Sequence, residues 1–411
     1  MSVVTHVEYD RKPTSLLMLA GLFVFLSLFD YYRLSSLPLL RTPSATVGLL
    51  LAACYGLYAL SGYRIHSGTP MWFWVFFLGI VATQLLRIAA GGDAQWPFFM
   101  QWVQIIILAM ILVDLSRDPR AFNILLGAIV IAALFLAIAG SLGVSQVNNG
   151  RVGYEDIDLN RQANVYTLGL LTLLWLMIER TRTFRLWQMA CLIAGCVVLM
   201  LAALKTGSRG GFLTMIAGVG LLLLLEARKR NSSAYVFFIP PMLLIALAMI
   251  ASNDLVIGRL IGTLNGQEDN SRIVIWENAV QLLMNHPLVG NGPYFMERLG
   301  SYFWAGRILN AHNGYLQVLL AFGIPIFLLW LGMVGSVLRR CWRVRQAPEG
   351  ALLLSLMITM LLFGFTIDLA FDRFFWFVLV LAANVERYPA FLRRQLLDGG
   401  TRHVTTVARR P

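Results

Sequence analysis

The chain has 411 residues, of which 58% are apolar and only 13% are charged, and its mean hydropathy is +0.71. Soluble proteins average about 25% charged residues, so this composition excludes a soluble globular protein. The net charge of +12 predicts no nucleic-acid partner, because most of the basic residues lie at one end of the apolar runs. There they set membrane topology and contact membrane lipids with anionic headgroups.

The apolar runs have the length of membrane-spanning helices. A spanning helix needs roughly 20 apolar residues, and windows of that length predict an all-α polytopic membrane protein with about twelve transmembrane helices. The first run is too long for a cleavable signal peptide and is expected to remain as a span. The expected spans are 15–31, 44–61, 71–90, 96–113, 121–141, 163–179, 186–204, 211–226, 234–251, 313–338, 351–367 and 371–386.

The basic residues of the loops orient these spans. They alternate so that both termini are expected in the cytoplasm and the long polar segment 252–312 in the periplasm. The expected organisation is a helical part at 1–251, this periplasmic loop at 252–312, further helices at 313–388 and a basic cytoplasmic tail at 389–411. The four cysteines lie in or beside spans, so they predict neither disulfides nor a metal site.

Three arginines on the predicted periplasmic face stand out because they lie at helix starts. Arg161 opens the span at 163–179, Arg209 lies in a Gly-rich turn before the span at 211–226, and Arg272 precedes a short amphipathic helix at 273–285. A guanidinium fork suits bidentate phosphate binding, and a helix N-terminus adds unpaired N–H groups. Together they predict a site for an anionic headgroup larger than one phosphate. The alternative is that each arginine only extends to lipid headgroups.

His312 ends the polar loop and is followed at once by Asn313 and an apolar helix. An ordinary histidine pKa near 6.5 suits a general base at periplasmic pH. Neither a nucleophile elbow nor metal-ligand spacing accompanies it, so the residues favour a metal-free base supported by arginines. A histidine at this boundary can also be a hydrogen-bonded interface residue, and that alternative stays open.

Four motifs carry a resemblance to a known family over roughly residues 160–330. The chain resembles the O-antigen ligase and polymerase superfamily of bacterial envelope glycan enzymes, with the ligases the better match. The motifs are Thr206-Gly207-Ser208-Arg209-Gly210, Ser271-Arg272 with Trp276, His286-Pro287-Leu288-Val289-Gly290-Asn291-Gly292, and Ala311-His312-Asn313-Gly314-Tyr315-Leu316 with Gly323.

The resemblance implies an inverting, metal-independent and cofactor-free glycosyl transfer at the periplasmic face of the inner membrane. The donor would be a glycan on undecaprenyl pyrophosphate, and the acceptor a hydroxyl of lipid A-core. His312 would be the catalytic base, and Arg272 and Arg161 would hold the pyrophosphate. Arg209 would assist or be structural, and Asn313 would orient the histidine or the acceptor. Transient contact with other envelope glycan assembly proteins is also implied.

Several alternatives remain. Family members have an asparagine near the start of the helix at 163–179, and Asn160 and Asn164 both compete for that position. A polymerase or a protein-glycosylating relative would use the same chemistry. A lipid-linked oligosaccharide flippase would share the helices and the outer arginines, but should show repeated halves and broken helices. A metal-dependent transferase would need the carboxylates of Glu155, Asp156 and Asp158.

Overall fold

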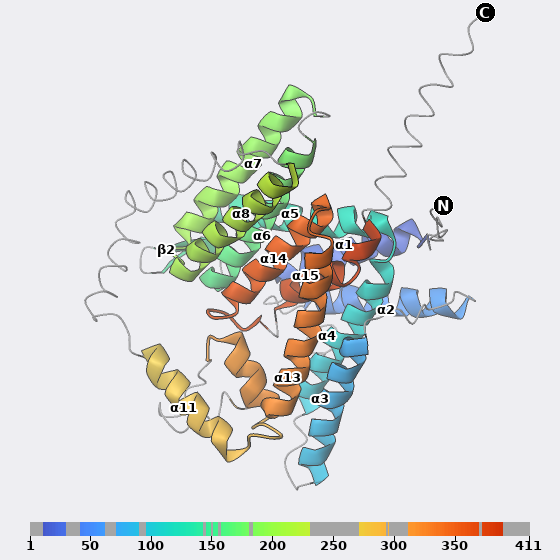
Figure 1. Ribbon diagram of the computed structural model, residues 1–411, viewed down its shortest axis with the longest axis vertical. Helices are drawn as coiled ribbons and strands as arrows, with labels where there is room; N and C mark the ends of the chain where they lie inside the picture. Colours follow the sequence, from blue (N-terminus) through green and yellow to red (C-terminus); the bar gives the residue numbers. More distant parts are fainter. Residues whose placement is uncertain are drawn as a thin grey trace, which may run out of the picture.

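The computed structural model describes residues 11–29, 42–61, 71–89, 96–142, 145–148, 151–154, 158–180, 184–230, 271–292, 295, 311–369 and 372–388. These residues are almost entirely helical (Figure 1). Each helix is named here with its bounds: α1 (Thr14–Leu26), α2 (Pro43–Leu60), α3 (Met71–Ala89), α4 (Trp96–Leu115), α5 (Pro119–Ser141), α6 (Leu159–Arg180), α7 (Leu186–Lys205), α8 (Arg209–Arg230), α11 (Ser271–Asn285), α13 (Gly314–Arg343), α14 (Pro348–Phe363) and α15 (Arg373–Ala383). Two 3₁₀ turns, Ser27–Phe29 and Val385–Arg387, follow α1 and α15.

Among the described residues, six helices are long and apolar enough to cross a membrane: α2, α3, α5, α7, α8 and α13. The apolar helices α1, α14 and α15 are shorter, as is the apolar stretch Phe99–Leu115 within α4. The chain is therefore a polytopic helical membrane protein, as its hydropathy predicts. The expected span at 234–251 and most of the loop at 252–312 lie outside the described residues.

A two-stranded antiparallel hairpin departs from the all-α prediction. Strand β1 (Ser145–Asn148) pairs with β2 (Arg151–Tyr154), with Ser145 opposite Tyr154. The sequence signal was present, because Asn149-Gly150 between two short runs is the preferred dipeptide for a two-residue hairpin turn. The hairpin packs against α5 and α6 just before the start of α6.

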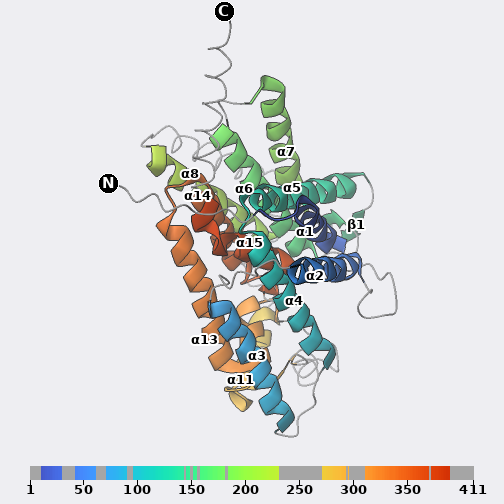
Figure 2. The same cartoon turned by 90° about the vertical axis from the view of Figure 1, so that its right-hand side faces the viewer.

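In the upper part of Figures 1 and 2, α6 packs against α5, α7, α8 and α14. In the lower part, α3 and α11 each pack against α13. Small residues allow these helices to approach closely. A Cβ at Gly169 of α6 would lie 2.7 Å from the Cβ of Ala133 in α5, and one at Gly218 of α8 would lie 2.3 Å from the Thr359 hydroxyl in α14. Glycine at such contacts is typical of membrane helix pairs, where dispersion contacts take the place of the hydrophobic effect.

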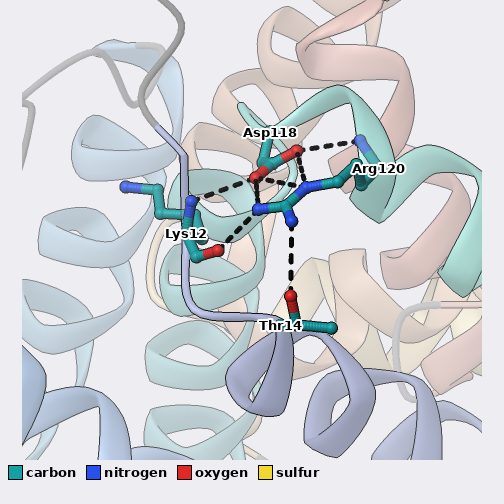
Figure 3. Close-up of polar contacts among 4 residues, drawn as sticks. All are labelled: Lys12, Thr14, Asp118 and Arg120. Carbon is teal, nitrogen blue, oxygen red and sulfur yellow. Dashed lines mark hydrogen bonds and ion pairs between the residues drawn. The ribbon is translucent and has the colours of Figure 1, made fainter.

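A buried charge cluster joins the start of α1 to the turn between α4 and α5 (Figure 3). The Lys12 ammonium donates to Asp114 at 2.8 Å, and the Lys12 backbone N–H donates to Asp118 at 3.0 Å. The Arg120 guanidinium donates to the Asp118 carboxylate and to the Lys12 carbonyl, at 2.6 Å in each case. Burial alone would raise the pKa of Asp118, but the hydrogen bonds from Arg120 and Lys12 outweigh it and hold the pKa below its usual range.

Candidate functional site

His312 lies at the start of α13 in a strained backbone conformation. Its φ of +45° makes it the one non-glycine residue with positive φ in the described part of the chain. Such a conformation costs a residue other than glycine about 1–2 kcal/mol. The next residue, Asn313, caps α13, because its side chain accepts from the N–H groups of Tyr315 and Leu316, at 3.0 and 3.2 Å. The turn directs the chain into the helix immediately after His312.

Helix α11 fixes the other side of this turn. The Trp276 indole N–H donates to the carbonyl of Ala311 at 3.0 Å, directly before His312. Arg272 lies in the first turn of α11, four residues before Trp276, and therefore on the same face of the helix at the level of its backbone. The start of α11 and the start of α13 thus meet through one hydrogen bond.

The turn after α11 forms backbone hydrogen bonds with α13 at a point where that helix is broken. Gly323 has φ +79° and ψ 177°, so α13 is two helices joined at this residue instead of the single span expected at 313–338. The backbone N–H of Asn291 donates to the Leu320 carbonyl at 2.6 Å, and the N–H of Gly292 donates to the Ala321 carbonyl at 3.0 Å. Carbonyls freed by the break are therefore satisfied by the His-Pro-Leu-Val-Gly-Asn-Gly turn, as buried backbone requires.

Glycine is needed on both sides of that contact. A Cβ at Gly290 would lie 2.6 Å from the backbone of Ala321, and a Cβ at Gly323 would lie 2.6 Å from the backbone of Leu288. Both residues have positive φ. The two backbones touch, and the short first half of α13, which begins directly after His312, is held rigidly by this contact.

The starts of α6 and α8 form a second pair. The Ser208 hydroxyl donates to the side-chain carbonyl of Asn160 at 2.8 Å and accepts from the N–H of Gly211 at 3.0 Å, so it caps α8 while bonding to α6. A Cβ at Gly211 would lie 2.6 Å from the Cβ of Ala163. Arg209, which opens α8, is consequently held beside the first turn of α6.

Arg161 is held by a carboxylate that the sequence did not single out. Its Nε lies 3.1 Å from the Oδ2 of Asp372, which is 3% exposed. The other oxygen of Asp372 caps α15 by accepting from the N–H groups of Phe374 and Phe375. Helix α6 begins at Leu159, and the Asp158 carboxylate caps it by accepting from the N–H groups of Asn160 and Arg161. Arg161 therefore lies inside the first helical turn.

The described residues between α14 and α15, 364–369 and 372, border both pairs of helix starts. Gly314 of α13 donates to the Gly364 carbonyl at 2.7 Å, a Cβ at Gly210 of α8 would lie 2.6 Å from the Thr366 methyl group, and Asp372 bonds to Arg161. These residues thus connect the helix starts that carry His312, Arg209 and Arg161.

The two competing asparagines differ in the structure. Asn160 bonds to Ser208, whereas Asn164 is fully buried and has no hydrogen-bond partner for its amide among the described residues. Gln317, one turn into α13, is 2% exposed and its side-chain oxygen likewise lacks a partner in that part of the chain. Buried amides without partners cost about 1–3 kcal/mol each, so Asn164 and Gln317 are further candidates for substrate contact.

Sequence reasoning missed Asp372 and the segment before it. A signal existed, because carboxylates at the edge of an apolar span are costly unless they are paired. Asp368 lies just before the last expected span, and Asp372 lies at its start. The partner could not be read from the sequence, since Arg161 lies far away along the chain. The arrangement offers a histidine on a fixed backbone close to arginine-bearing helix starts, which suits proton removal combined with stabilisation of an anion.

Residues 194–331 match the model of the O-antigen ligase family. The matched stretch runs from α7 to beyond the break in α13 and includes Arg209, Arg272, His312 and Asn313, while Arg161 precedes it. The chain thus carries an O-antigen ligase domain in this region, which confirms the resemblance drawn from the motifs. A search of curated proteins gave no match.

Proposed function

We propose, starting from the O-antigen ligase domain at residues 194–331, that this transferase moves a glycan from undecaprenyl pyrophosphate to a hydroxyl of lipid A-core. The observation that carries the proposal is the backbone of His312. A histidine occupies a position that asparagine or glycine would fill with less strain, and the residues on either side of it, Ala311 and Asn313, are both held by hydrogen bonds. Strain of this kind is retained where a side chain has a task.

In the proposed reaction, His312 takes the proton of the acceptor hydroxyl as the oxygen attacks the anomeric carbon of the donor sugar. The bond between that carbon and the pyrophosphate oxygen breaks, and the configuration inverts. Negative charge then accumulates on the leaving pyrophosphate, where Arg161 and Arg272 stabilise it. A fixed electrostatic contact of this type is worth about 3–4 kcal/mol in the transition state. No nucleotide is required, because the sugar–pyrophosphate bond is already activated.

Asp372 supports this role for Arg161 by orienting its guanidinium. Arg209 and Asn313 serve mainly in positioning, since Arg209 starts a helix fixed to α6 and Asn313 caps the helix after His312. The proposed setting is the periplasmic side of a bacterial inner membrane, with about twelve transmembrane helices, both termini in the cytoplasm and the 252–312 loop over the site.

The direct test uses purified protein, a polyprenyl-pyrophosphate glycan and lipid A-core. We expect transfer to persist in EDTA, and we expect Arg272→Lys to weaken it, because lysine keeps the charge but loses the bidentate fork. Unchanged turnover and donor affinity in Arg272→Lys would remove the case for phosphate binding by that residue. Elongation of a second lipid-linked glycan in place of lipid A-core transfer would identify the protein as a polymerase.

A further inference from the structure

A membrane-facing groove lies apart from His312, between α1, α2, α4 and α15. It has a volume of about 170 Å³ and is almost wholly apolar. One wall is lined by three small residues of α2 spaced three and four residues apart, Ala45, Gly48 and Ala52. This wall is closely packed at Gly48, where a Cβ would lie 3.1 Å from the Phe23 ring and 3.2 Å from Leu108. The opposite wall includes Trp376 and Phe377 of α15.

One end of the groove is polar. Arg373, at the start of α15, is the one charged residue among the described residues that line it, and it bonds to the Ser44 hydroxyl at the start of α2. Gln101 and Gln104 line the same region from α4, one helical turn apart. Amides on a membrane helix normally face a partner helix or a polar cavity instead of hydrocarbon. These residues make a small polar mouth on an otherwise apolar channel.

The groove also borders the side of the bundle that meets lipid. Leu49 on α2 and Ile107 on α4 line it, and each is 45% exposed, as expected for side chains in contact with hydrocarbon. The lining residues of α4 run from Gln101 to Leu112, a rise of about 16 Å. That length is close to one leaflet of a hydrocarbon core about 30 Å thick.

We propose that this groove is a binding site for an anionic phospholipid, with one acyl chain between α2 and α4 and the phosphate at Arg373. The length fits a single leaflet-long acyl chain, whereas a polyprenyl chain is several times longer. One arginine matches the single negative charge of a phosphodiester, while a pyrophosphate carries more charge. The site does not depend on the proposed glycosyl transfer. A bound lipid would hold the start of α15 in place, and the residue directly before that helix, Asp372, bonds to Arg161.

Native mass spectrometry of the purified full chain tests the site. After delipidation in detergent, phosphatidylglycerol is titrated back, and phosphatidylethanolamine serves as the zwitterionic comparison. We expect one tightly bound phosphatidylglycerol per chain and weaker phosphatidylethanolamine binding. Arg373→Gln should weaken phosphatidylglycerol binding by about tenfold or more, because it removes a hydrogen bond between two charged groups.

Groove-filling variants provide the second arm. Ala52→Phe should abolish tight binding by occupying the channel, while Ala53→Phe, on the exposed side of the same helix, should bind like the wild type. Ala45→Leu replaces Ala52→Phe if the latter does not fold. The proposal would be overturned if Arg373→Gln and a folded groove-filling variant both bound phosphatidylglycerol with the wild-type affinity. Displacement of phosphatidylglycerol by polyprenyl phosphate at equal concentration would also overturn it, and would assign the groove to the donor's chain.

Discussion

His312 shows how much a single residue's backbone adds to what its chemistry predicts. Its position at the start of an apolar helix was readable from the sequence, and the structure confirms that a helix begins at Gly314. Its positive φ was not readable, because that angle results from the Asn313 cap and from the bond between Trp276 and the Ala311 carbonyl. The positive φ also decides which substitution should be used to test His312 as a base. Asparagine adopts positive φ more readily than alanine, so His312→Asn removes the base with little added strain.

Asp372 has two functions that one substitution can separate. Asp372→Ser keeps an oxygen that caps α15, because serine is as good an N-cap as aspartate, but it loses the ion pair with Arg161. We predict that glycan transfer falls at least tenfold while the unfolding midpoint changes little. Asp372→Ala should lose both, with an additional destabilisation of about 1 kcal/mol. Glycan-transfer rates in detergent and thermal unfolding midpoints, measured on the same samples, test both predictions. Full transfer activity in Asp372→Ser would show that Arg161 needs no orienting partner.

At the scale of elements, the broken helix α13 carries a clear stability prediction. Gly323→Ala places a Cβ 2.6 Å from the Leu288 backbone at a φ of +79°, so we expect a destabilisation of about 2–3 kcal/mol or more. Gly335→Ala is the matched control, since this glycine of α13 has open space around its Cβ position. That change should be neutral or stabilise by up to about 1 kcal/mol. Similar unfolding midpoints for the two variants would contradict the claim that close backbone contact at Gly323 fixes the break in α13.

The positions of the helices could be predicted from the sequence, but the contacts that end or cap them could not. Hydropathy located the described helices, and the amphipathic pattern at 273–285 correctly predicted α11. The Gly323-Ile324-Pro325 triplet marks the end of the helical run after His312, but the sequence does not show that the break in α13 contacts the turn at 286–292. The start of α6 agrees with the sequence, which places Arg161 at a helix start, and the structure adds that the Asp158 carboxylate caps this helix. Capping and packing contacts of this kind are not encoded in hydrophobic periodicity.

At the scale of the whole molecule, the cluster around Asp118 ties α1 to α5 and predicts a pH dependence. The folded pKa of Asp118 is below the ordinary value of about 3.9. Its ion pair with Arg120 therefore stabilises the fold fully above about pH 4, and this contribution is lost as the pH falls through the folded pKa. We predict that Asp118→Asn lowers the unfolding midpoint at pH 6 and that the difference from the wild type shrinks below pH 4. A difference that stays constant from pH 6 to pH 3 would contradict this.

The convergence of distant segments is the whole-molecule feature that the sequence could only assume. Arg161 and His312 lie at the starts of helices far apart in the chain. The described residues 364–369 and 372, which carried no recognised motif, border both helix starts. The sequence could propose each residue from its local chemistry, because helix starts and boundary histidines are local features. It could not supply Asp372 as the partner of Arg161, because that contact depends on how α6 and α15 pack.

The most direct test of the account is the single-turnover rate of glycan transfer to lipid A-core by wild-type protein and by His312→Asn, at saturating donor. General-base catalysis contributes about 10²–10⁴-fold, so the rate should fall by at least 100-fold, with folding and donor binding unchanged. A His312→Asn protein that transfers at the wild-type rate would contradict the central claim that His312 is the base.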